Sequence, residues 1–143
     1  MSVRTFARLF GIAFLLIGIA GFIPGLTTPH SHPGASDVAI DAGLGDALGL
    51  FPVNAVHNVI HIAFGVWGLA AARSVGAARG YGKGVAIIYG ALTIFGLIPA
   101  ARIWTAFGLA PLYGNDVWLH LVLAAVAGYF GFVHREPAAD QGH

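Results

Sequence analysis

Four long apolar stretches constrain the fold of this chain more than any other feature. They cover residues 6–26, 52–72, 85–107 and 116–133, and each has the roughly 17–25 residues that a helix needs to cross a bilayer. Only 9% of the 143 residues are charged and the mean hydropathy is +0.80, whereas a soluble domain carries about 25% charged residues. The sequence therefore predicts an all-α fold, a four-helix transmembrane bundle that forms one polytopic membrane domain over residues 1–143.

The distribution of cations predicts how these helices are oriented. Five of the seven Lys and Arg residues lie in two clusters, Arg4 with Arg8 and Arg73 with Arg79 and Lys83. Because Lys and Arg concentrate in cytoplasmic segments, the N-terminus, the connection around 73–83 and the tail 134–143 are expected in the cytoplasm. The outer loop 27–51 then lies outside, and we expect a multi-pass protein of a bacterial cytoplasmic membrane.

The first stretch and the outer loop need separate interpretation. The first stretch begins like a secretory signal peptide, but it is about 20 residues long and no A-x-A cleavage site follows it, so we interpret it as a retained helix. Near the end of the outer loop we expect a short interfacial helical turn at 43–50. We interpret His30 and His32 as solvated loop residues, since no further metal ligands lie near them in the sequence.

Polar side chains interrupt the second apolar stretch, in the segment Asn54-Ala-Val-His57-Asn58-Val-Ile-His61. Spacings of three and four residues place them on one face of a helix. Polar side chains at membrane depth are costly, so they usually face the interior of a bundle and mark a partner or a function. With Pro52 at the outer entry of this helix, Asn54 lies near the outer interface, and His57 and His61 lie roughly 8 and 14 Å below Pro52.

The third and fourth helices are expected to bring further polar residues to the same depth. The fourth helix places Asp116 at its outer mouth and His120 about one turn deeper, with Asn115 or Asp116 suited to cap it. Arg102 approaches from the third helix, which we expect to kink at Pro99. The ionisable residues within the spans therefore collect in the outer half of the membrane.

A metal or cofactor site is one interpretation of this cluster. His57 and His61 can present two imidazoles to one ion, and His120 with Asp116 can complete the ligand set. The polar neighbours expected to orient these ligands are Asn54, Asn58, Arg102 and Asn115. Because the chain has no cysteine, the fitting metals are zinc, copper, iron and manganese. A haem or chlorin needs only one axial histidine per face, which leaves the close pair unexplained.

Two other interpretations remain open. The cluster can lock the helices together by interhelical hydrogen bonds, each worth roughly 0.6 kcal/mol, or it can relay protons or a small substrate, because histidine titrates near neutrality. Some members also have local explanations: Trp104 and Trp118 fit an outer aromatic belt, and Arg102 can extend to the headgroups. The absence of a nucleophile–base pair or a phosphate loop argues against an enzyme.

Two motifs resemble those of a known family. The segments are Phe51-Pro-Val-Asn54-Ala-Val-His57-Asn58-Val-Ile-His61-Ile-Ala-Phe-Gly65 and Pro111-Leu-Tyr-Gly-Asn115-Asp116-Val-Trp118-Leu-His120. They resemble the second and fourth helices of a bacterial integral-membrane family filed as domain of unknown function 4383. The resemblance implies a four-helix membrane protein and singles out the polar positions already named. It implies no activity.

The hypothesis that we favour is a small binding or accessory protein of the membrane, with a His/Asn/Asp site that holds a metal or cofactor. The alternatives are a structural subunit in which the site only fixes helix packing, and a transport or sensing protein. Four spans make a small protein, so we expect a homo-oligomer or a subunit of a larger membrane complex, embedded in the lipid bilayer. The net charge of +1 provides no basic surface for nucleic acid.

Overall fold

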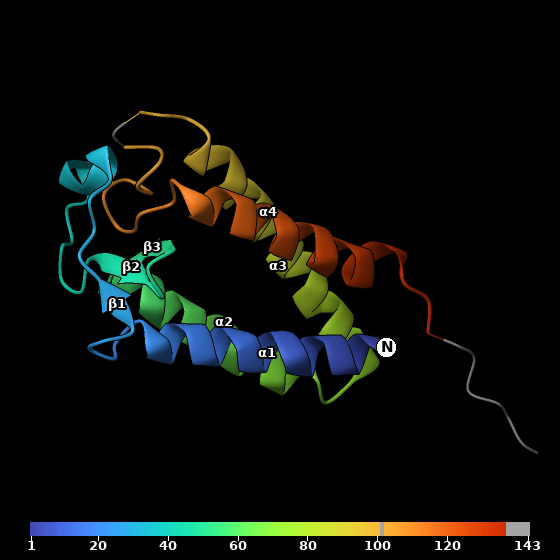
Figure 1. The fold of residues 1–143 in the computed structure, drawn as a ribbon. Coiled ribbons are helices and arrows are strands. Elements are labelled where there is room, and N and C mark those ends of the chain that lie inside the picture. Colours follow the sequence, from blue (N-terminus) through green and yellow to red (C-terminus); the bar gives the residue numbers. More distant parts are fainter. Residues whose placement is uncertain (101, 137–143) are drawn as a thin grey trace, which may run out of the picture.

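The computed structural model describes residues 1–100 and 102–136. Within them the chain forms four α-helices: α1 (Val3–Ala20), α2 (Ala55–Ala71), α3 (Val75–Gly96) and α4 (Asn115–Gly128), the last continued by a π-helix, Tyr129–Val133. Helix α1 packs along α2, and α3 packs along α4 (Figure 1). The prediction of a mainly helical fold with four helices is confirmed. Most of the expected tail, residues 137–143, lies outside the described residues.

The outer loop contains regular structure that the sequence analysis missed. Strands β1 (Thr27–Thr28), β2 (Gly45–Ala47) and β3 (Phe51–Val53) form an antiparallel sheet in that order, and Pro33–Asp37 forms a 3₁₀ helix. The expected helical turn at 43–50 is therefore wrong. The reason is that Gly43 and Gly49 adopt positive φ angles of 69°, a conformation that ends helices and starts turns. The end of the bundle that carries the strands is called the sheet end below.

Helices α1 and α3 do not have the expected bounds. Each begins earlier than its apolar stretch, because Ser2 and Ser74 accept hydrogen bonds from backbone N–H groups of the first turn. The expected connection at 73–83 is therefore mostly the start of α3. Helix α1 ends at Ala20 and not at residue 26, because a turn begins at Gly21.

Pro99 terminates the third helix instead of kinking it. Helix α3 ends at Gly96, three residues before Pro99 and not at 107 as expected. A proline clashes with helical backbone at the residue before it and has no N–H to donate. Arg102 consequently lies in the connection to α4, where its side chain is exposed, and not at the end of a membrane-spanning helix.

The starts of α2 and α4 also differ from the prediction. Pro52 lies in β3, and Asn54 caps α2 by accepting a hydrogen bond from the His57 N–H at 2.9 Å. Helix α4 is capped by Gly114, whose φ is 67° and which has no side chain to contribute. The expectation that Asn115 or Asp116 caps this helix is therefore wrong, because both lie inside its first turn.

Glycines bring the backbones of α1 and α2 into direct contact. A Cβ atom built on Gly11 would lie 2.8 Å from the Leu69 nitrogen and 2.9 Å from the Gly65 oxygen. The Gly68 Cβ would lie 2.8 Å from the Gly11 Cα. Close approach of this kind is how small residues hold membrane helices together. Gly18 packs against α2 in the same way, whereas Gly25 lies in the turn that follows α1.

Replacing Gly65 by alanine is expected to destabilise the bundle by about 1–3 kcal/mol, because the added methyl forces two backbones apart. Its Cβ would lie 2.8 Å from the Leu15 nitrogen and 2.9 Å from the Gly11 oxygen. The matched control is Gly90→Ala in α3, where nothing lies within 4 Å of the new Cβ; there alanine is expected to stabilise the helix by about 0.5–1 kcal/mol. Thermal unfolding in detergent measures both. Equal effects would contradict the close packing.

The two helix pairs meet through an aromatic core at the end of the bundle opposite the sheet. The Phe6 and Phe130 rings stack there, with centroids 4.7 Å apart, and the buried Tyr81 ring of α3 lies 6.2 Å from Phe6. Two helical segments, α1 and Asn115–Val133, are long and apolar enough to cross a membrane. Helix α2 is apolar but has 17 residues.

Candidate metal centre between the helix pairs

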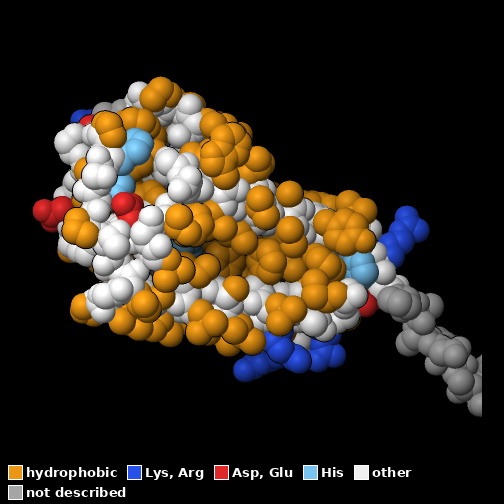
Figure 2. Space-filling model, viewed as in Figure 1, with side chains coloured by type: hydrophobic (Ala, Val, Ile, Leu, Met, Phe, Trp, Pro, Cys, Tyr) orange, Lys and Arg blue, Asp and Glu red, His pale blue; other side chains and the backbone are white. Residues whose placement is uncertain are grey.

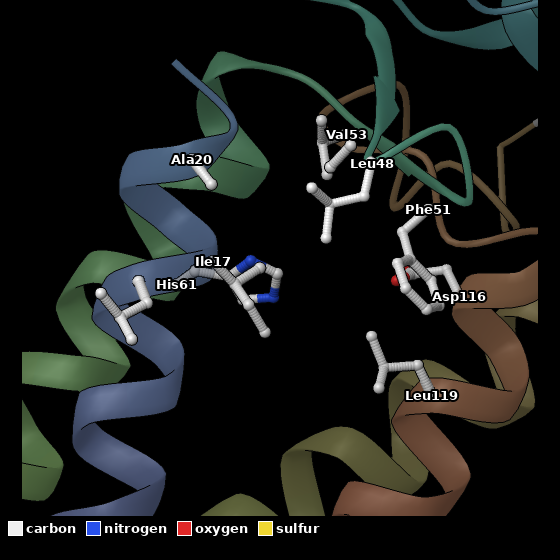
Figure 3. Close-up of a pocket in the computed structure, with 10 residues that line it drawn as sticks. Ile17, Ala20, Leu48, Phe51, Val53, His61, Asp116 and Leu119 are labelled. Carbon is white, nitrogen blue, oxygen red and sulfur yellow. The ribbon is translucent and has the colours of Figure 1, made fainter. Parts of the chain in front are cut away.

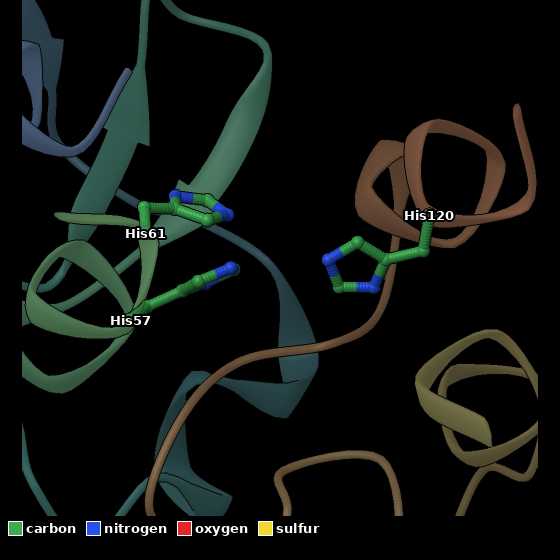
Figure 4. A group of neighbouring side chains, drawn as sticks. All are labelled: His57, His61 and His120. Carbon is green, nitrogen blue, oxygen red and sulfur yellow. The ribbon is translucent and has the colours of Figure 1, made fainter. Parts of the chain in front are cut away.

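Two facing helices each present two ligand-type side chains four residues apart. His57 and His61 lie on α2, and Asp116 and His120 lie on α4. Residues at this spacing share one face of a helix, and these two faces point at each other (Figure 4). We call these four residues the His/Asp cluster. The structure thus brings together all four residues that the sequence analysis selected as metal ligands.

The distances within the His/Asp cluster suit a small ion. Ligand nitrogens of the three histidines all lie within 4.8 Å of one another. The Asp116 Oδ2 lies 3.3 Å from the His120 Nε2 and 3.8 Å from the His57 Nε2. Four ligands at about 2.1 Å from a tetrahedral ion lie roughly 3.4 Å apart. Small side-chain rotations therefore suffice to bring these atoms around a common centre.

The cluster is buried, yet many of its polar atoms have no partner. The four side chains are at most 4% exposed. The Nδ1 atoms of His57, His61 and His120, the Nε2 of His120 and both carboxylate oxygens of Asp116 make no hydrogen bond to any described residue. Leaving a buried donor or acceptor unpaired costs about 1–3 kcal/mol per group. Six unpaired atoms in one place call for partners from outside the chain, such as a metal ion or ordered water.

Aromatic rings form the floor of the cluster on the side away from the sheet. The Phe14 ring stacks on His61 with a centroid distance of 5.7 Å, and Tyr89 meets His120 edge-on at 4.8 Å. Both rings are almost completely buried. They restrict the rotation of the imidazoles and exclude water from below.

An apolar pocket opens on the other side of the cluster. It has a volume of about 260 Å³, and His61 and Asp116 are its polar members (Figure 3). The remaining lining residues come from α1, α4 and the β2–β3 hairpin and include Ile17, Leu48 and Leu119. No local pattern in the sequence predicts this pocket, because its walls come from segments that are distant in the chain.

The two asparagines do not contact the imidazoles as expected. Asn54 is fully buried, and its amide donates to the backbone oxygens of Ile40 and Leu109 at 2.8 Å. It supports the site by capping α2 and joining two loops. Asn58 faces α1, where a Cβ on Gly21 would overlap its amide group.

The remaining predicted residues lie around the sheet end, outside the cluster. Asn115 is exposed and donates to the Leu50 oxygen at 3.1 Å. Trp104 donates from Nε1 to the Asp37 Oδ2 at 2.9 Å, and Trp118 projects from α4 with 60% of its surface exposed. Arg102 is also excluded from the cluster, because it follows α3 in an exposed turn.

A second polar group joins the loops at the sheet end. His30 contacts the Asp46 Oδ1 at 2.6 Å through Nδ1 and the Tyr113 hydroxyl at 3.0 Å through Nε2. His32 stacks on Tyr113 with ring centroids 4.2 Å apart. The interpretation of His30 and His32 as solvated is therefore wrong. His30 is separated from Asp46 by 16 residues and from Tyr113 by 83 residues. No local sequence pattern therefore predicts this group.

The environment of this loop group shifts two titrations. Partial burial, with a smaller contribution from His30, lowers the pKa of His32 below its ordinary value. Burial raises the pKa of Tyr113 to about 12, and the charges of Asp46 and Asp37 add to this effect. The Tyr113 hydroxyl therefore stays protonated at neutral pH, and it can donate to or accept from His30.

A comparison with family models supports the resemblance seen in the two motifs. The model described as Domain of unknown function (DUF4383) matches residues 4–133, which reach from α1 to the end of the π-helix and include the whole His/Asp cluster. Comparisons with curated proteins and with solved structures gave no match. Because the match covers most of the chain, the expected family is confirmed: this protein belongs to the family described as Domain of unknown function (DUF4383).

Proposed function

We propose that the protein is a multi-pass membrane protein that binds a divalent transition-metal ion inside its helix bundle. His57, His61 and His120 hold the ion, and Asp116 lies beside them to supply negative charge or a fourth ligand. The buried ligand atoms without hydrogen-bond partners carry this proposal. Its biological setting is an accessory or binding role in the bacterial cytoplasmic membrane.

The exposed surface of the bundle supports its placement in a membrane. Large apolar side chains stand exposed along all four helices, among them Leu16, Ile60, Ile87 and Val122. Hydrophobic side chains cover most of the flank seen in Figure 2. An apolar surface of this extent is not stable in water. Lipid therefore covers the flanks of the bundle. We call this exposed apolar surface the apolar belt. Because it includes side chains of all four helices, α2 and α3 lie in the membrane together with α1 and α4.

The charges lie at the two ends of this apolar belt. At the end opposite the sheet, Arg4 donates to the Ala72 oxygen and Arg79 to the His134 oxygen, both at 2.9 Å. Acidic side chains gather at the sheet end, where Asp37 and Asp46 lie, and most basic ones lie at the other end, although Figure 2 also shows one basic side chain at the sheet end and one acidic side chain at the other. Because cations favour the cytoplasmic side, the sheet end faces outward. His61 then lies about 9 Å along α2 from its outer end.

The ligand set restricts the metal to a few ions. Three imidazoles and one carboxylate suit zinc, iron, copper or manganese, and the absence of thiolate disfavours soft ions. Zinc is the simplest fit, because three histidines with one further position form a tetrahedral zinc site. Metal sites between facing helices are also a recurring feature of helical bundles. Packing alone would instead pair each imidazole with a separate protein group.

The purified protein is expected to contain about one transition-metal ion per chain, because four ligand-type groups converge on one centre. Elemental analysis of protein purified in detergent measures the content, and an absorption spectrum shows whether a haem or chlorin is present. A chelated sample should regain the ion on dialysis against zinc. A chain that neither retains nor takes up metal at stoichiometric amounts would contradict the proposed centre.

The natural absence of cysteine allows a direct test of orientation. Asp41→Cys introduces a thiol in the exposed outer loop, and Gly76→Cys introduces one in the exposed first turn of α3. Because opposite ends of the belt lie on opposite sides of the membrane, an impermeant maleimide is expected to label the Asp41→Cys variant in spheroplasts. The Gly76→Cys variant should react only after lysis. Labelling of both variants before lysis, or the reverse order, would overturn the proposed topology.

A further inference from the structure

We propose that the apolar pocket is the binding site for a lipid-soluble molecule with a monoanionic oxygen head, such as a single-chain carboxylic acid. Its head contacts the metal beside Asp116, and its hydrocarbon body lies between α1 and α4. This inference rests on the proposed metal centre and adds the class of molecule that the centre receives.

The walls of the pocket have the character of a lipid site. Leu16, Ile17 and Ala20 of α1 form one wall, and Leu119 of α4 stands opposite (Figure 3). Leu16 is 63% exposed, so the pocket is open on the flank that the proposed membrane covers. Helices α1 and α4 belong to different pairs (Figure 1), and the pocket lies between them, so a hydrocarbon chain enters from the lipid without unfolding either pair.

At its inner end the pocket reaches two of the four residues of the proposed metal centre. Of the His/Asp cluster, His61 and Asp116 line the pocket, and both carry buried atoms without partners. The side of the ion that is free for an outside ligand therefore faces the pocket. A divalent ion with three neutral imidazoles and one carboxylate leaves a net charge of +1, which a monoanionic head neutralises in surroundings of low dielectric.

The roof of the pocket contains a residue in an unfavourable conformation. Leu48 has a φ of 54° and its side chain projects from the β2–β3 hairpin over the pocket. The left-handed conformation is unfavourable for leucine because its Cβ crowds the following carbonyl oxygen, whereas glycine adopts it freely. The hairpin instead places a leucine at the mouth, 63% exposed, where a hydrocarbon chain would cover it.

The volume sets the size of the bound body. A cavity of about 150 Å³ is enough for a benzene molecule, and this pocket has about 260 Å³. It accommodates a short alkyl segment, while the rest of a longer chain remains in the lipid.

Cobalt-loaded protein in lipid nanodiscs provides the test. We expect decanoate to shift the visible absorption bands of bound cobalt at concentrations at least roughly 50-fold lower than acetate, because several methylene groups enter the pocket. Decanol has the same chain without the anionic head and should leave the bands nearly unchanged. Equal responses to decanoate and acetate, or no response to decanoate, would overturn the inference.

A pair of variants on α1 separates the pocket from the metal centre. Ala20→Phe fills the pocket and is expected to weaken the decanoate response by at least about tenfold while cobalt still binds. Ile19→Phe adds the same ring to a neighbouring residue outside the lining and should change neither property. If the wild-type chain takes up no cobalt, both proposals are wrong. If it takes up cobalt and Ala20→Phe responds like Ile19→Phe, only the pocket assignment is wrong.

Discussion

Replacing His120 by alanine is expected to lower the affinity for zinc by more than about 100-fold. Loss of a residue that only hydrogen-bonds to a metal ligand costs up to about 100-fold, and loss of a ligand itself should cost more. His120 is fully buried and is the only histidine that α4 contributes to the cluster. Without it the ion loses its only imidazole from α4, and Asp116 is the one ligand-type group left on that helix. Competition with a chromophoric chelator measures the change in dissociation constant.

The control for this variant is another histidine near the end of the same helical segment. His134 follows the π-helix at the far end, and its ring contacts Tyr129 and Phe130 instead of the cluster. His134→Ala should keep the wild-type zinc affinity. If His120→Ala bound zinc as tightly as His134→Ala, the three-histidine centre would be refuted.

Replacing Asp116 by leucine is expected to have opposite effects on the metal-free and the metal-bound protein. In the metal-free protein Asp116 is 1% exposed and both of its oxygens lack hydrogen bonds to described residues. Removing a buried polar group that makes no hydrogen bond relieves a cost of about 1–3 kcal/mol. The variant should therefore unfold at a higher temperature than the wild type in the presence of a chelator.

With zinc added, the order is expected to reverse. A metal at about 1,000 times its dissociation constant stabilises the folded state by roughly 4 kcal/mol, and the leucine variant loses much of this gain. Thermal unfolding with zinc and with chelator gives both numbers for each protein. Asp41→Leu, which changes an exposed acid in the outer loop, controls for the loss of one charge. A leucine variant destabilised to the same extent with and without zinc would show that Asp116 serves packing alone.

Both predictions depend on how two helix pairs meet, and the sequence anticipated this in part. The spacing of His57 with His61 and of Asp116 with His120 follows from helical periodicity, so their pairing was predictable as soon as the helices were. Helix ends were less predictable. Ser2 and Ser74 extended α1 and α3 backwards, and Pro99 stopped α3 far short of the apolar stretch. Hydropathy alone does not show where a capping residue starts a helix or a proline ends it.

The sequence by itself determined the helical class of this protein, its family and the four ligand-type residues, because apolar runs, period and motif are local properties. Only the tertiary structure decided which neighbours belong to the site. Asn58 lies against Gly21 of α1, and Arg102 lies in an exposed turn outside the bundle. Residues of α1, α4 and the β2–β3 hairpin form an apolar pocket. Those outcomes depend on contacts between segments far apart in the chain, and no local pattern encodes which surfaces will face each other once the glycine contacts set the distance between helices.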